Sequence, residues 1–195
     1  MVLQCGIFFD VKDLDSFVKN ELFDLSKYRD LDVNFVHDLI PKEYMRPLPL
    51  PTPKSQAFMY YDGYTFRQKN SLVIYVNNSF DNWVTNIEFT CEKYGYKALY
   101  VYIDNESLFP GYKLYYYNGK FSRIIYSIKD GERWVFFEKG ASQDFEMGAT
   151  YSERGATKKF NYSKLKLFCN NLGVDIDSAD FLLPIENIYH TYVIS

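Results

Sequence analysis

The sequence has few of the residues from which catalytic and metal centres are usually built. Its 195 residues include two histidines, His37 and His190, and three cysteines. It has none of the short motifs typical of serine hydrolases, zinc proteases, paired-cysteine metal sites or phosphate-binding loops. We therefore expect no cofactor and no metal, and the sequence favours a binding protein, with an enzyme as the alternative.

The three cysteines are odd in number and far apart, unlike the cysteines of a secreted disulfide framework. Cys5, Cys91 and Cys169 each lie in an apolar run or stripe. In such surroundings a free cysteine usually behaves as a small, inert hydrophobe. The sequence therefore predicts three unpaired and mostly buried thiols.

Long hydrophobic runs and a basic charge are also missing. No apolar stretch approaches the roughly eighteen residues of a membrane span, and Met1–Asp10 has no basic residue ahead of its apolar run. The net charge of −3 disfavours nucleic acid, whose binding surfaces are basic. We expect a cytoplasmic protein that binds neither membranes nor nucleic acid. The sequence does not indicate its oligomeric state.

Aromatic residues are abundant, at 19% of the chain, and they mark the clearest structural signal. Asn118-Gly119 and Asp130-Gly131 separate three runs of aromatic and β-branched residues. Both dipeptides favour two-residue hairpin turns, which predicts a three-stranded meander over about 112–138. The expected strands are 112–117, 120–128 and 132–138. The fold class is then α+β, a single domain over 1–195 with a mainly antiparallel sheet packed against two or three helices.

The predicted meander has two apolar faces, because side chains alternate along each strand. With Asn118-Gly119 and Asp130-Gly131 as turn residues, Tyr117 lies opposite Lys120 and Lys129 opposite Glu132. We expect the more aliphatic face to be the main core. That face carries Tyr115, Ser122, Ile124, Tyr126, Ile128, Val135 and Phe137. The second face carries Leu114, Tyr116, Phe121, Arg123, Ile125, Trp134 and Phe136.

Other elements follow from periodicity and turn residues. Apolar residues at helical spacing predict helices after Asp13, within 80–94 and within 162–172. Paired strands are expected in 56–68 around Asp62-Gly63, whereas 31–40 fits either a strand or a short helix. The proline-rich segment 41–53 is expected to be a stiff surface loop, and 140–155 a polar, mobile loop.

Arg123 is the charged residue among the apolar residues of the second face, where we expect it close to Trp134 and Leu114. It could stack on aromatic rings, pair with a buried acid, hold an anionic ligand or contact a partner. The enzyme alternative is a hydrolase or transferase with an anionic-ligand pocket near Arg123.

Residues 1–40 contain eight acidic and four basic residues. Such a surplus fits either a solvated helix face or a surface that attracts a basic partner. We predict a small acidic module that binds another protein, such as a toxin-neutralising immunity protein or an inhibitor. A structural subunit of a bacterial or phage assembly is a further alternative. The predicted partner-binding residues are Asp15, Glu21, Asp24, Arg123 and Trp134.

Parts of the chain also bear a general resemblance to other sequences. The segment Lys129–Phe136, together with Lys159-Phe160 and Leu172–Val174, resembles segments of bacterial proteins of that class. The resemblance covers less than half of the chain. No residue roles are taken from it.

Overall fold

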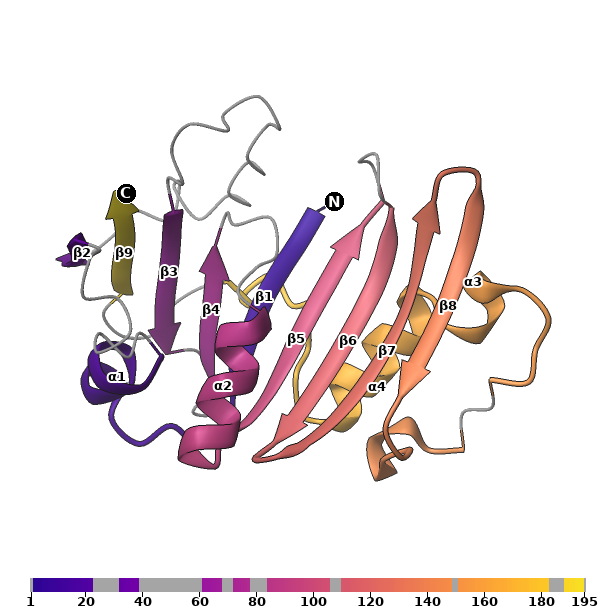
Figure 1. The fold of residues 1–195 in the computed structure, drawn as a ribbon, viewed down its shortest axis with the longest axis horizontal. Helices are drawn as coiled ribbons and strands as arrows, with labels where there is room; N and C mark the ends of the chain where they lie inside the picture. Colours follow the sequence, from indigo (N-terminus) through magenta and orange to yellow (C-terminus); the bar gives the residue numbers. More distant parts are fainter. Residues whose placement is uncertain are drawn as a thin grey trace.

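The computed structural model describes residues 2–22, 32–38, 61–67, 72–77, 84–105, 110–148, 151–182 and 188–194. Within these ranges, nine strands form one sheet in the order β2-β9-β3-β4-β1-β5-β6-β7-β8, and every neighbouring pair is antiparallel (Figure 1). The strands are β1 (Val2–Phe8), β2 (Asp32–Asp38), β3 (Tyr61–Arg67), β4 (Val73–Asn77), β5 (Lys97–Asp104), β6 (Gly111–Asn118), β7 (Phe121–Asp130), β8 (Arg133–Lys139) and β9 (Ile188–Ile194). The predicted α+β class and meander are confirmed.

Helices cover both faces of the sheet. The Asp13 side chain caps α1 (Leu14–Ser16) by accepting from the Ser16 amide at 3.0 Å, and the chain continues as a π-helical segment, η1 (Phe17–Leu22). With α2 (Val84–Tyr94) these elements lie on one face, called here the α2 face. The opposite, α4 face carries α3 (Ala156–Lys159) and α4 (Tyr162–Asn171). No helix in the described ranges is long and apolar enough to cross a membrane.

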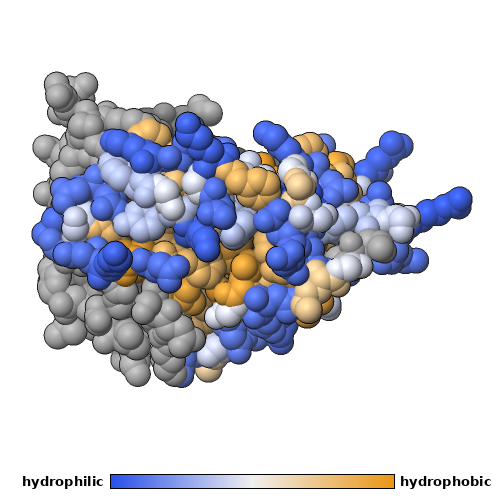
Figure 2. All heavy atoms as spheres, turned by 90° about the horizontal axis from the view of Figure 1, so that it is seen from below, coloured by the Kyte–Doolittle hydropathy of each residue, from blue (hydrophilic) through white to orange (hydrophobic). Residues whose placement is uncertain are grey.

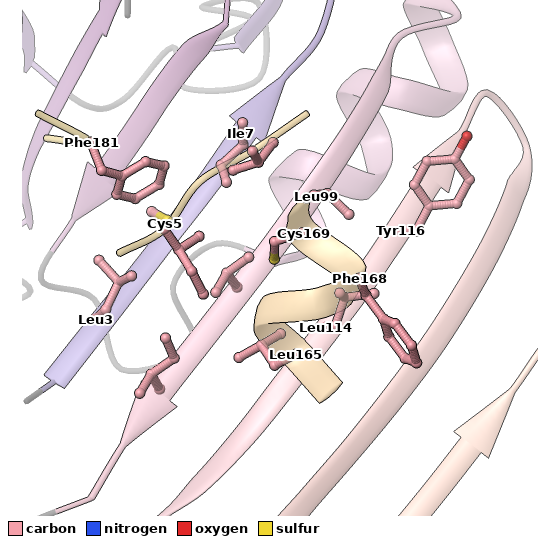
Figure 3. Packing of buried hydrophobic residues seen from close by; sticks show 14 of the residues in the cluster. Leu3, Cys5, Ile7, Leu99, Leu114, Tyr116, Leu165, Phe168, Cys169 and Phe181 are labelled. Carbon is pink, nitrogen blue, oxygen red and sulfur yellow. The ribbon is translucent and has the colours of Figure 1, made fainter. Parts of the chain in front are cut away.

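The central strand β1 contributes to two separate cores. Leu3, Cys5 and Ile7 face the α4 side, where they join Leu165, Phe168 and Cys169 of α4 (Figure 3). Phe8 faces the α2 side and joins a cluster that includes Ile87 and Cys91 of α2. A strand buried on both faces reads as a continuous apolar run, as residues 2–9 largely do.

The meander register differs from the expected one by two residues. Asn118 pairs with Phe121 and Asp130 with Arg133, so the turn residues are Gly119-Lys120 and Gly131-Glu132. Only the glycine in each pair has a positive φ, +57° and +59°, which is the pattern of a type II′ turn with glycine first. A shift by two residues keeps every side chain on its predicted face but changes its partner across the strands.

The prediction of the main core was wrong for the outer part of the meander. Arg123, Ile125 and Ser127 of the α4 face are buried, whereas Val135 and Phe137 of the more aliphatic α2 face are exposed. The reason is coverage, since α3, α4 and η4 (Asp144–Glu146), a 3₁₀ turn, pack behind β6, β7 and β8. Burial there depends on which face a distant segment covers, and side-chain polarity is secondary.

The structure corrects or resolves three further expectations from the sequence. Asp62-Gly63 is not a turn, because β3 runs through it and pairs with β4 and β9. Residues 32–38 form a strand, which settles the alternative left open for 31–40. Within the expected polar loop 140–155, Phe145 and Glu146 are buried in η4, whereas most of the other described residues of the loop are exposed. The proline-rich segment 41–53 lies outside the described residues.

The three thiols are free and fully buried, as predicted. Burial raises the pKa of Cys91 and of Cys169 to about 12, and it raises the pKa of Cys5 further, with the nearby Cys169 adding to the shift. Reaction with maleimide requires an accessible thiolate. We therefore expect all three cysteines to react slowly at pH 7 and rapidly after addition of denaturant, as measured by mass spectrometry. Rapid labelling of the folded protein would contradict the buried placement.

Candidate functional site

A groove of about 450 Å³ opens beside α1, next to the ends of α2 and β1. We call it the Glu21 groove. Its charged lining residues are Asp10, Lys12, Asp13, Glu21 and Lys97, and its aromatic lining residues are Phe9, Tyr94 and Tyr96. The groove therefore combines charged and aromatic walls. Viewed from below, the described surface of the whole molecule is mostly hydrophilic, with hydrophobic residues gathered in a band across its middle (Figure 2).

Side chains of α2 hold the end of η1 against the groove. The last carbonyl groups of a helix have no partner within the helix. Here Tyr94 donates to the Asn20 carbonyl at 3.1 Å, Thr90 to the Glu21 carbonyl at 3.4 Å and Asn86 to the Leu22 carbonyl at 2.6 Å. These bonds fix the backbone that carries Glu21. Short π-helical segments are rare and occur often at functional sites.

Glu21 is the least satisfied of the groove's acids. Its carboxylate accepts a hydrogen bond from the Tyr96 hydroxyl, and burial together with this carboxylate raises the pKa of Tyr96. The Tyr96 ring is in turn fixed by Phe17, at 5.3 Å between ring centroids. The second carboxylate oxygen, Oε2, is buried and has no hydrogen-bond partner. An unpaired buried acceptor is costly. Because Oε2 is closed to solvent, the Glu21 side chain must turn toward the groove before a donor placed there can relieve that cost.

The other acids on this side have different surroundings. Asp15 is exposed and forms an exposed ion pair with Lys19 at 2.6 Å, a kind of contact that contributes little to stability. Asp13 is engaged in capping α1. Asp24, the third predicted binding residue of this region, lies outside the described residues. The structure thus brings Glu21 into a groove and leaves Asp15 on the surface nearby.

Arg123 is placed as a buried structural cation, with 1% of its surface exposed. Its Nε and Nη2 donate to the two oxygens of Glu146 at 2.9 and 2.8 Å, and Nη2 also reaches Glu138 at 2.8 Å. Nη1 donates to the Gly140 carbonyl at 2.9 Å, and the Tyr151 ring lies 5.6 Å away. Two of the roles considered for Arg123, pairing with a buried acid and contact with an aromatic ring, are therefore both observed.

This geometry leaves the guanidinium committed to the protein itself. Every nitrogen of Arg123 donates to a carboxylate or carbonyl of the chain, so an anionic ligand would have to displace one of them. Trp134 does not lie across from Arg123, since it pairs with Lys129 near the far end of β8. Trp134 is 37% exposed, and β5, β6 and β7 lie between its strand β8 and the central strand β1, whose end adjoins the groove. Neither residue therefore shares a surface with Glu21.

Glu146 is the residue that the sequence reasoning missed. It is 3% exposed and accepts from Arg123, from the Tyr151 hydroxyl and from the Gln143 amide at 2.8 Å. Two signals could have identified it. A buried arginine needs an acid, and Gln143 followed three residues later by Glu146 has the spacing of a capping box.

Within the described part of the chain, no group of three or more histidine, cysteine or acidic side chains is placed to hold a metal ion. Comparison with protein-family models, with curated proteins and with solved structures found no match to this chain.

The Glu146 ion pair makes stability depend on pH. Burial alone would raise the pKa of Glu146, but hydrogen bonds from Arg123, Tyr151 and the Gln143 amide lower it below the ordinary 4.5. A depressed folded-state pKa stabilises the fold above the ordinary value, and this contribution is lost as pH falls below it. We expect Glu146→Gln to cost about 3 kcal/mol at pH 7 and to flatten the loss of stability between pH 4.5 and lower pH.

The measurement is urea unfolding at several pH values. Glu138→Gln is the matched control, because the Glu138 side chain is 40% exposed and contacts the same nitrogen of Arg123. A partly exposed ion pair is expected to contribute less than about 1 kcal/mol. Equal losses for the two variants would show that burial of Glu146 is not what makes the pair important.

Proposed function

We propose that this protein is a binding module that holds a basic protein partner against the side formed by α1, η1 and the Glu21 groove. Within that class it fits an inhibitor or an immunity protein that neutralises a toxin. The observation that carries the proposal is the groove with its unpartnered buried Glu21 oxygen. A lysine or arginine side chain of a partner would supply both the positive charge and the hydrogen-bond donor that Glu21 lacks.

The shape and composition of the groove suit a side chain. The rings of Tyr94 and Tyr96 line the groove and offer apolar contact for the methylene stem of a long basic residue. The Glu21 carboxylate then pairs with the charged end of that basic residue. Asp10 and Asp13 add negative charge, opposed by Lys12 and Lys97. This mixture favours a partner that presents its basic residues in one arrangement over nonspecific attraction of any polycation.

The surrounding acids act at longer range. Asp10 and Asp15 are exposed, and eight acidic residues against four basic ones fall within the first 40 positions. Exposed charges contribute little to the final affinity but raise the rate of encounter with an oppositely charged protein. The account therefore assigns affinity to the groove and association rate to the surface acids.

The prediction concerns the variant Asp15→Lys, Glu21→Lys, Asp24→Lys. With a partner captured from the source cells by the wild-type chain, we expect roughly tenfold slower association in low salt, because attraction becomes repulsion. The difference should shrink as ionic strength rises, since screening acts over roughly 10 Å at 0.1 M salt. Surface-based binding kinetics at two salt concentrations measure both effects.

A second triple variant, Asp130→Lys, Glu132→Lys, Glu153→Lys, serves as the control. It changes net charge by the same amount at three exposed positions on and beyond the meander. It should associate at nearly the wild-type rate. Equal slowing by both variants would indicate a net-charge effect only, and unchanged association of the first, folded variant would refute the proposed surface.

A further inference from the structure

The outermost strand of the meander is unusually exposed for a strand rich in large apolar residues. β8 ends the sheet and pairs only with β7 among the described strands. Five large hydrophobic side chains are exposed in the described part of the chain, and three of them lie on β8: Trp134 (37%), Val135 (41%) and Phe137 (41%). An exposed apolar edge strand is a template for pairing with another chain, which proteins normally avoid.

The register shows which backbone groups of β8 are open. In a two-residue hairpin the residues that flank the turn, Asp130 and Arg133, exchange hydrogen bonds, and along an antiparallel pair such residues alternate with ones that point away. The amides and carbonyls of Trp134, Phe136 and Glu138 therefore point away from β7. None of them takes part in a hydrogen bond recorded within the described residues.

The two sides of this edge have different roles. The Phe136 side chain already has partners within the chain, since its ring stacks on Tyr151 at 5.4 Å and lies under Lys159. Val135 and Phe137 point to the α2 face, where Phe137 stacks on Tyr126 at 5.0 Å and no described helix reaches. An added strand would extend this apolar strip and cover Val135 and Phe137 from the side.

The charges of β8 argue against a second copy as the occupant. In a two-fold antiparallel pairing of all seven residues, Phe136 lies opposite itself, and Arg133 lies opposite Lys139 at both ends. Like charges directly opposite each other destabilise paired strands. The same two residues would attract carboxylates at the two ends of a foreign strand, with apolar residues between them.

We propose that β8 is a docking edge for an extended segment of another protein, which adds an antiparallel strand to the sheet. The segment carries acidic residues opposite Arg133 and Lys139 and apolar residues opposite Val135 and Phe137. The main-chain hydrogen bonds come from Trp134, Phe136 and Glu138. This mode supplies affinity through the backbone and selectivity through alternate side chains. It is independent of the Glu21 groove, which lies at the ends of β1 and β5, with β6 and β7 between β5 and β8.

The experiment uses a fluorescent probe peptide, Glu-Thr-Val-Thr-Val-Tyr-Glu, blocked at both ends, and the full chain. We expect saturable binding by anisotropy at concentrations up to about 1 mM, the weak end of specific association. The double variant Arg133→Glu, Lys139→Glu should weaken binding roughly tenfold, because two attractive pairs become repulsive. The charge-reversed peptide, Lys-Thr-Val-Thr-Val-Tyr-Lys, should bind that variant again. Such recovery of binding would also show that the variant is folded.

Hydrogen exchange then identifies the mode of binding. The amides of Trp134, Phe136 and Glu138 should become protected in the complex, whereas those of Val135 and Phe137, already bonded to β7, should change little. No saturable binding of the first peptide would overturn the proposal. Equal affinity of that peptide for the wild-type chain and for the double variant would also overturn it. A dimer of the free chain in sedimentation, abolished by Glu138→Pro, would replace it with a second copy as the occupant.

Discussion

Burial of β1 on both of its faces is the constraint on which the rest of the structure depends. Cys5 and Ile7 need the α4 side covered, and Phe8 needs the α2 side covered, so helices from opposite ends of the chain must pack on one strand. The turn that follows β1 is thereby placed beside the end of α2. Asp13 starts α1 there, and the α2 side chains that bond to η1 carry Glu21 to the groove.

Local chemistry explains what could be predicted from the sequence. The hairpin glycines, the cap at Asp13 and the apolar stripe of α4 act over a few residues, and all three appear in the structure. The failures concern contacts between distant segments. Asp62-Gly63 has turn chemistry, yet pairing with β4 and β9 keeps it in a strand. Glu146 lies in a polar segment, yet it is buried because it pairs with Arg123. Glu21 was selected for its charge, and its unpaired buried oxygen could not be foreseen.

The buried ion pair has a structural role, and the two proposed binding surfaces lie at different places on the sheet. Arg123 and Glu146 attach the segment after β8 to the back of the meander, which leaves Phe136 supported and the edge of β8 open. The Glu21 groove lies beside α1 at the ends of α2, β1 and β5, and β6 and β7 separate β5 from β8. A partner large enough to reach both would contact the chain through charge at one end and through backbone at the other. Each surface is nevertheless complete without the other.

The central claim is that a basic partner seats on the Glu21 groove. Hydrogen exchange of the complex with the captured partner, followed by mass spectrometry of its peptides, tests that claim most directly. The account predicts slower exchange in residues 10–22 and 94–97, which line or support the groove, with helix α4, on the opposite face of the sheet, unchanged. Unchanged exchange in both of those segments, with protection confined to other parts of the sheet, would contradict it.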